Sequence, residues 1–326
     1  MPPTLRFRAD RTFTIVQFTD THFKNGEPGD GLTDRLMRDV LAAENPDLVI
    51  FTGDVIEGER CQDPAFAFLR AVRPVVDRGV PWAVVLGNHD DEGELTRLDL
   101  MRLQRDLPGC LSHPGPPTVS GVGNYVLPVY APQSDRPAAA LYCLDSNSYA
   151  EQAVGGRNVG GYGWIRRDQI DWYLETSAGL TAANGGVPLP ALAFFHIPLP
   201  EYDEVWDHHT CYGVKYEPVC APRLNSGFFA ALVEAGDVMG TFVGHDHIND
   251  FMGELHGIRL CYGRATGFNT YGLHSMAHGA RVIRLVEGER DFTTWLRLEG
   301  GEVVDAQPRH DPDGVRSLTV RPDFEI

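Results

Sequence analysis

The first ninety residues alternate between short apolar runs and segments with helical spacing. Thr33–Asn45 and Ala65–Arg78 carry apolar side chains at helical intervals, although Pro74 is expected to kink or divide the second helix. The β-α-β-α-β order predicts parallel strands joined by right-handed crossovers, and therefore an α/β fold. Three runs rich in β-branched and aromatic residues have the composition of buried strands: Phe13–Thr19, Leu48–Thr52 and Trp82–Leu86.

Beyond residue 90 the strand signals continue while the helical ones become fewer. The segment from about residue 300 is polar and contains prolines, so it is expected to be weakly structured. We see no internal repeat or low-complexity linker, which favours one domain over residues 1–326. The later patterns predict strands at Leu141–Leu144, Leu192–Phe195 and Val238–Val243, helices at Asp168–Ser177 and Gly227–Ala235 (the second capped by Ser226), and finally consecutive antiparallel strands at Ile258–Tyr262, Ala280–Val286 and Phe292–Leu298.

The chain is acidic, with 28 Lys and Arg against 45 Asp and Glu among 326 residues, a formal net charge of −17. Such a surface repels nucleic acid and anionic lipid, so we expect neither as a partner. No apolar stretch is long enough to span a bilayer. Because Met1–Arg11 has no apolar signal core, a cytoplasmic location is expected.

Six cysteines do not make a disulfide scaffold in a chain of this length. Cys211 and Cys220 lie in a polar segment where they could pair. The nearby His208 and His209 would also permit a metal in that loop. A loop with neither role is the simpler expectation.

Each of five strand-like runs is followed directly by a short polar cluster. The carboxyl ends of strands form the ligand crevice of open α/β sheets, so clusters placed there converge in space. Any one of them alone is a common turn, helix cap or core histidine. We do not expect all five clusters to follow strands by accident. Together they therefore predict one functional site. The clusters are Asp20-Thr21-His22, Gly53-Asp54, Gly87-Asn88-His89-Asp90, His196 and Gly244-His245-Asp246-His247.

These clusters supply the donors of a metal site. A tetrahedral zinc needs about four donors, so the larger number here suits two ions that share a bridging carboxylate. Oxygen and nitrogen donors without thiolate favour Zn, Mn or Fe. The donors are two carboxylates, four imidazoles and one amide oxygen, from Asp20, His22, Asp54, Asn88, His196, His245 and His247.

The order of the clusters resembles the calcineurin-like metallophosphoesterase superfamily, whose pattern is D-x-H, G-D-x-x, G-N-H-[DE], a lone H and G-H-x-H. HIPLPEY (196–202), GHDHINDF (244–251) and YGRATGFNTYG (262–272) look like its purple-acid-phosphatase-like branch, which occurs in plants and fungi and has bacterial relatives. The resemblance implies a four-layer αββα sandwich of two mixed β-sheets. In that arrangement the late antiparallel strands would fill the second sheet.

The resemblance also implies a role for each donor. Asp54 would bridge the two ions. Asp20, His22 and His247 would complete the first site, while Asn88, His196 and His245 would complete the second.

Other residues near the clusters are assigned through the same resemblance. His89 would not bind metal but would protonate the leaving oxygen or steady the phosphoryl group. Glu57 stands where true purple acid phosphatases have an iron-binding tyrosine, which argues against a purple ferric site. Either Glu57 or Asp90 would orient His89, unless Glu57 is a solvated loop carboxylate. Arg264 is a candidate substrate contact, with an internal salt bridge as the alternative.

Together these assignments predict hydrolysis of a small phosphate monoester or diester by a metal-bound hydroxide, without a covalent enzyme intermediate. The alternatives are a non-catalytic metal-binding scaffold, a nuclease and a phosphotriesterase on the same fold. A non-catalytic scaffold is expected to have lost metal ligands, and none of the seven candidate ligands is missing from this sequence. The acidity of the chain argues against the nuclease. The oligomeric state stays open.

Overall fold

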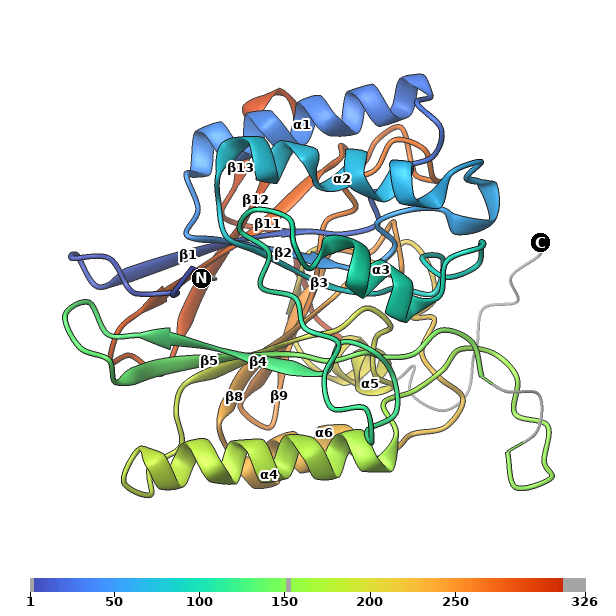
Figure 1. Ribbon diagram of the computed structural model, residues 1–326. Helices are drawn as coiled ribbons and strands as arrows, with labels where there is room; N and C mark the ends of the chain where they lie inside the picture. The colour runs from blue at the N-terminus through green and yellow to red at the C-terminus, as the bar shows by residue number, and fades with distance from the viewer. Residues whose placement is uncertain (1–2, 151–153, 313–326) are drawn as a thin grey trace.

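In the computed structural model, which describes residues 3–150 and 154–312, two β-sheets lie face to face between two layers of helices (Figure 1). Apolar side chains form a buried cluster between the sheets, including Phe13, Ile50 and Phe194. A second cluster packs the first sheet against its helices, and a third does the same for the other sheet. The predicted four-layer αββα sandwich of mixed sheets is therefore confirmed.

The first sheet contains the parallel strands expected at the N-terminus. In β2, Leu48 and Ile50 face the other sheet while Val49 and Phe51 face the helices, so both faces are buried and the whole run is apolar. Helices α1 (Pro28–Glu44) and α2 (Pro64–Arg78) connect the parallel strands and cover the outer face. The strand order is β13 (Val303–Val304), β12 (Phe292–Leu298), β11 (Gly279–Val286), β1 (Thr12–Phe18), β2 (Leu48–Thr52) and β3 (Trp82–Val85).

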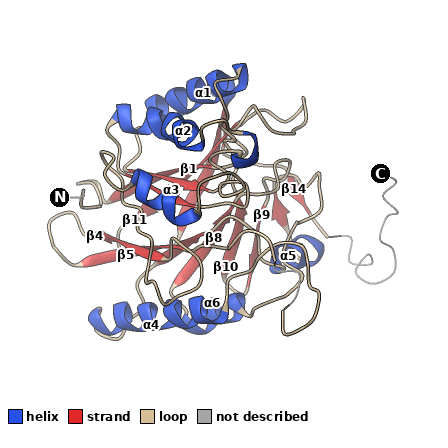
Figure 2. Cartoon of the chain, turned by 45° about the vertical axis from the view of Figure 1, so that its right-hand side comes forward, coloured by secondary structure: helices blue, strands red, loops and turns tan. Residues whose placement is uncertain are grey.

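The second sheet is longer and also mixed. Its inner strands β10, β8, β6 and β5 are parallel, while β4 and β9 pair antiparallel to their neighbours. Helices α4 (Arg167–Ala183) and α6 (Phe228–Ala235) lie along its outer face (Figure 2). The order is β14 (Arg309–His310), β7 (Cys211–Tyr212), β9 (Met252–Leu255), β10 (Ile258–Tyr262), β8 (Val238–Val243), β6 (Ala191–Phe194), β5 (Pro137–Cys143) and β4 (Tyr125–Tyr130).

The late strands do not fill the second sheet together, so that expectation is wrong. Strand β10 joins the second sheet parallel to β8, whereas β11 and β12 extend the first sheet beside β1. The chain crosses from one sheet to the other between β10 and β11. The three successive strands β10, β11 and β12 therefore do not form one antiparallel meander. Instead, β11 pairs in antiparallel register with the open edge of β1.

The segment after residue 300 is more ordered than expected. Strand β13 pairs with β12, and β14 pairs with β7 at the far edge of the second sheet. Pairing of this kind uses backbone groups, so a polar, proline-containing sequence gives little sign of it. Residues 313–326 lie outside the described part of the chain.

Helix α2 continues through Pro74, so the proline does not divide it. The cap expected for a later helix is wrong. Helix α6 starts from Gly227, whose φ of 80° is left-handed, rather than from a Ser226 cap. Sequence patterns also miss two helices of eight residues, α3 (Arg97–Gln104) and α5 (Glu201–His208). Short 3₁₀ turns occupy Gly58–Arg60 and Glu299–Gly301.

The six cysteines, all within the described residues, are free, so Cys211 and Cys220 do not pair. Cys211 is buried in β7 and donates to the Val205 carbonyl, which takes it out of the polar loop. Among the described helices, none has both the length and the apolar character that crossing a membrane requires.

Candidate metal centre

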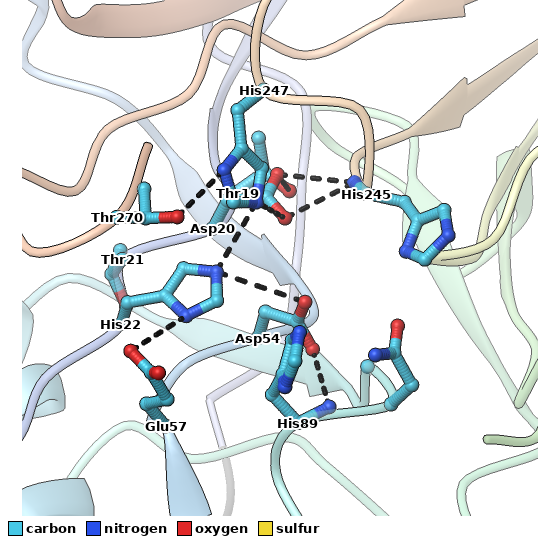
Figure 3. Close-up of polar contacts among 12 residues, drawn as sticks. Thr19, Asp20, Thr21, His22, Asp54, Glu57, His89, His245, His247 and Thr270 are labelled. Carbon is cyan, nitrogen blue, oxygen red and sulfur yellow. Dashed lines mark hydrogen bonds and ion pairs between the residues drawn. The ribbon is translucent and has the colours of Figure 1, made fainter. Parts of the chain in front are cut away.

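The five polar clusters follow β1, β2, β3, β6 and β8, and the fold brings them to one place between the two sheets. Ligand atoms of Asp20, His22, Asp54 and His247 all lie within 4.8 Å of one another. Ligand atoms of Asp54, His196 and His245 meet the same limit. Asp54 belongs to both groups, as a bridging carboxylate must, and Figure 3 shows it beside His22.

The backbone is strained where these side chains leave their strands. Asp20, His22, Asp54 and His245 have left-handed φ values of 52°, 45°, 48° and 79°. Such a conformation costs on the order of 1–3 kcal/mol for each non-glycine residue. Hydrogen bonds between the two turns hold it: Asp20 N donates to Gly53 O over 3.1 Å, and His22 N donates to Asp54 O over 3.0 Å. Strain concentrated on four donors of one cluster is typical of a functional site.

Glycines in the clusters allow the turns to approach each other closely. A Cβ on Gly87 would lie 2.1 Å from Asp54 Oδ1, and one on Gly244 would lie 1.9 Å from Thr19 Oγ1. Any side chain at either position would push a strand end away from the centre. The Gly-Asn and Gly-His pairs are therefore steric requirements of this site.

Hydrogen bonds orient the imidazoles toward the centre. His196 Nδ1 lies 2.7 Å from the Thr52 carbonyl, so it donates there and leaves Nε2 facing Asp54 Oδ2 at 3.1 Å. His247 Nδ1 lies 2.7 Å from Thr270 Oγ1, and its Nε2 faces His22 Nε2 at 3.3 Å. Metal-bound histidines are held in this way, with the remote nitrogen hydrogen-bonded.

The carboxylates are held by backbone amides. His245 N donates to both oxygens of Asp20 at 3.1 Å, and His89 N donates to Asp54 Oδ1 at 2.8 Å. Burial opposes ionisation of Asp54, but His196 and His22 beside it hold its pKa well below the usual value. Burial lowers the pKa of His245 to about 3, so its ring is neutral. Ionised carboxylates and neutral imidazoles are the forms that bind cations.

Four of the donor side chains have a buried polar atom with no hydrogen-bond partner within the described part of the chain. These atoms are His22 Nδ1, Asp54 Oδ2, Asn88 Oδ1 and His245 Nε2. An unpaired buried polar atom costs about 1–3 kcal/mol, so such a cluster calls for a ligand. Asp20, His22, Asp54, His196, His245 and His247 fit two cations by chemistry, burial and convergence. Asn88 is buried too, and it precedes His89, whose amide donates to Asp54.

The acid that contacts His89 differs from both candidates drawn from the sequence. His89 Nδ1 lies 2.6 Å from Glu92 Oε2, three residues further along. Burial opposes protonation of His89, but the carboxylates of Asp54 and Glu92 raise its pKa. Asp90 points back into the protein, where its oxygens accept from Ile56 N and Gly87 N. The run of acids after His89 is the available signal, but only the shape of the turn decides which of them faces the ring.

Glu57 is not a solvated loop carboxylate either. Its side chain is 14% exposed, and it pairs with Lys24 Nζ at 2.6 Å and with Arg60 Nε at 2.9 Å. One carboxylate oxygen lies 3.8 Å from His22 Nδ1, on the side of the ring away from Asp54. Glu57 therefore forms ion pairs with Lys24 and Arg60 and lies beyond hydrogen-bond distance of His22.

Arg264 forms an internal ion pair. Its side chain is 9% exposed, and its Nη1 lies 2.8 Å from Oδ2 of Asp250. The structure therefore agrees with the alternative for Arg264, an internal salt bridge. A buried arginine that already has a carboxylate partner gives no reason to expect a phosphate contact.

Arg97 braces the turn after β3, a role that the sequence patterns do not reveal. It donates to the carbonyls of Leu86 and Gly87 at 2.9 and 2.7 Å, and it pairs with the buried Asp145. This contact anchors the backbone that carries Asn88. No sequence motif marks it, because Arg97 and Asp145 are 48 residues apart.

The fold and this donor set define a calcineurin-like phosphoesterase. The model of that family matches residues 13–249, and the chain belongs to the family. Three of its relatives are named as purple acid phosphatases. "Probable inactive purple acid phosphatase 14" of Arabidopsis thaliana is 35% identical over 94% of this chain and 82% of its own length. "Phosphatase DCR2" of Saccharomyces cerevisiae is 35% identical over 94% of this chain but only 57% of its own length.

Solved structures show the same fold at low sequence identity. A dimetal phosphatase from Danio rerio superposes with a TM-score of 0.53 at 15% identity, covering 86% of this chain and 98% of the other. A purple acid phosphatase from yellow lupin seeds gives the same TM-score at 13% identity, covering 91% of this chain and 53% of the other. The sandwich is therefore a metallophosphoesterase fold.

Proposed function

We propose that this protein hydrolyses small phosphate monoesters or diesters with the help of two metal ions. The observation that carries the proposal is the convergence of six buried carboxylate and imidazole donors from both sheets, with the buried Asn88 on an adjoining turn. Four of these seven side chains have a polar atom without a hydrogen-bond partner among the described residues. Mn, Zn or Fe suits these donors. Asp20, His22 and His247 would hold one ion, Asn88, His196 and His245 the other, and Asp54 both.

Hydrolysis of a phosphate ester is extremely slow without a catalyst, because charge must be stabilised on the phosphoryl oxygens and the leaving group. When bound, two cations supply that stabilisation and make water a stronger nucleophile. His89 would serve the leaving group, and two observations support this role: its side chain is 34% exposed, and its Nδ1 is paired with Glu92. The other ring nitrogen is then free to give a proton to the departing oxygen.

The second candidate is a metal-binding scaffold without catalysis. Three relatives that are 35–36% identical carry names with the words "probable inactive". The complete donor set and the paired His89 of this chain favour hydrolysis, as does the relative named as a phosphatase. The net charge of −17 favours small substrates over nucleic acid.

Metal analysis and turnover together separate the two candidates. Protein purified without chelator and loaded with Mn²⁺ is expected to hold two ions per chain and to hydrolyse aryl phosphate mono- and diesters. Asp54→Ala and Asn88→Ala should lose both properties at least in part, while Asp135→Ala, whose side chain is 97% exposed, should retain them. Two bound ions with no turnover of any phosphorus ester would identify the scaffold instead.

A further inference from the structure

Tyr149 contacts both halves of the turn after β3, although it lies about sixty residues further along the chain. Its hydroxyl donates to Glu92 Oε1 over 2.5 Å and accepts from Asn88 Nδ2 over 3.0 Å. The other oxygen of Glu92 contacts His89 Nδ1 at 2.6 Å. A continuous hydrogen-bonded path therefore runs from a proposed metal ligand through Tyr149 and Glu92 to the proposed acid.

The direction of these bonds decides which end of the Asn88 amide faces the cations. Tyr149 gives its only proton to Glu92, so its oxygen is left to accept, and only the NH₂ group of Asn88 can donate to it. The amide oxygen must then point the other way. That oxygen is the buried, unpartnered Oδ1 among the metal donors.

The backbone around Tyr149 holds it in place. Ala150 N donates to Gly161 O and Gly163 N donates to Ser148 O, both over 2.8 Å, so the two ends of this loop are tied together. Ser148 Oγ also donates to the Asn88 carbonyl over 3.1 Å.

Two rings complete the attachment. Tyr149 stacks on Tyr162 with centroids 5.9 Å apart, and Tyr162 meets His245 edge-on at 4.3 Å. The tyrosine is thus anchored to the proposed second metal site from both sides.

We propose that Tyr149 is a positioning residue, which presents the Asn88 oxygen to the second metal ion and, through Glu92, orients His89 toward the leaving group. The part concerning His89 rests on the proposed function, and the part concerning Asn88 rests on metal binding alone. Hydrogen-bond partners of metal ligands typically change metal affinity or activity by about 10- to 100-fold.

Tyr149→Phe tests this directly, because it removes the hydroxyl and keeps the ring on Tyr162. Titration of the chelator-treated variant with Mn²⁺ is expected to show one of the two ions bound about 10- to 100-fold less tightly, with the other unchanged. For an aryl phosphate we expect kcat to fall by a similar factor while KM changes little. The melting temperature of the metal-free protein should stay as in the wild type, since Tyr149 is 48% exposed.

The matched control is Tyr130→Phe, at the end of β4 far from the strand ends that carry the clusters. It should behave as wild type in every measurement. The double variant Tyr149→Phe/Glu92→Gln should have a kcat close to that of the less active of the two single variants, because both substitutions break the same hydrogen-bonded path. Fully additive losses would contradict the path.

The outcomes separate this inference from the proposed function. If Tyr149→Phe binds both ions and turns over like the wild type, the inference is wrong and the function stands. If both ions weaken equally and the melting temperature falls, Tyr149 only stabilises the loop, and the inference is again wrong. If the wild type has no turnover, the proposed function fails, and the Mn²⁺ titration still decides the role of Tyr149 toward Asn88.

Discussion

Arg97 and Asp145 form a two-contact ion pair beneath the turn that carries Asn88 and His89, with Nε 3.0 Å from Oδ2 and Nη2 2.5 Å from Oδ1. Asp145 is fully buried, and the Arg97 side chain is 11% exposed. Asp145 also accepts from the backbone amides of Val122 and Asn147. The pair therefore ties together three loops that approach the metal centre.

Arg97→Ala is expected to destabilise the protein by about 3–5 kcal/mol, because it leaves the Asp145 charge buried without its partner. Urea unfolding of the metal-free protein measures this loss. Arg102→Ala removes an exposed pair with Asp99 three residues away and should change stability little. Equal effects of the two substitutions would show that the buried pair contributes no more than a surface pair.

Gly87→Ala should weaken metal binding through a steric clash alone. The new Cβ would lie 2.1 Å from Asp54 Oδ1 and must displace the bridging carboxylate or its strand end. We expect fewer than two Mn²⁺ per chain by elemental analysis after dialysis.

Gly31→Ala is the matched control for that clash. Gly31 lies inside α1 with open space around its Cα, so alanine should stabilise the helix by up to about 1 kcal/mol and leave both ions bound. Normal metal content in Gly87→Ala would contradict the close approach of the two turns.

Metal binding should raise the melting temperature of the wild type. Ions that bind only the folded chain stabilise it by about 2.7 kcal/mol at a free concentration 100 times the Kd. Adding Mn²⁺ to chelator-treated protein should therefore shift the transition upward, and excess chelator should reverse the shift. Asp54→Ala should show a much smaller shift, because Asp54 belongs to both groups of donors. An equal shift in the variant would place the ions elsewhere.

His89→Ala is expected to separate metal binding from catalysis. Loss of a general acid typically lowers the rate about 100- to 10,000-fold, so kcat for aryl phosphates should fall within that range. The imidazole of His89 belongs to neither donor group, so two Mn²⁺ ions should remain bound. His113→Ala, at an exposed position, serves as the control. Loss of an ion from His89→Ala would contradict its assignment as a non-ligand.

Sequence patterns predict the elements whose signals are local. Strand β2 is buried on both faces and therefore continuously apolar, and the donors directly follow strand ends, so residue order suffices to locate both. The arrangement inferred from the resemblance assigns β11 to the wrong sheet, because its partner β1 lies more than 260 residues earlier and the choice of sheet depends on which edge is open.

The supporting residues of the site are harder to find for a similar reason. Glu92 and Asp90 are both acids close to His89, and only the path of the turn separates them. Tyr149 carries no signal at all, since it reaches Asn88 from a different loop. The buried pairing of Arg264 with Asp250 depends on side-chain packing that spacing does not encode.

The position of β1 between β2 and β11 affects how the protein can be made in a cell. During synthesis Asp20 emerges first, and His245, whose amide holds its carboxylate, follows 225 residues later. The open edge of β1 stays uncovered until β11 has left the ribosome. The proposed metal site therefore stays incomplete until His247, the last of its donors, has been translated.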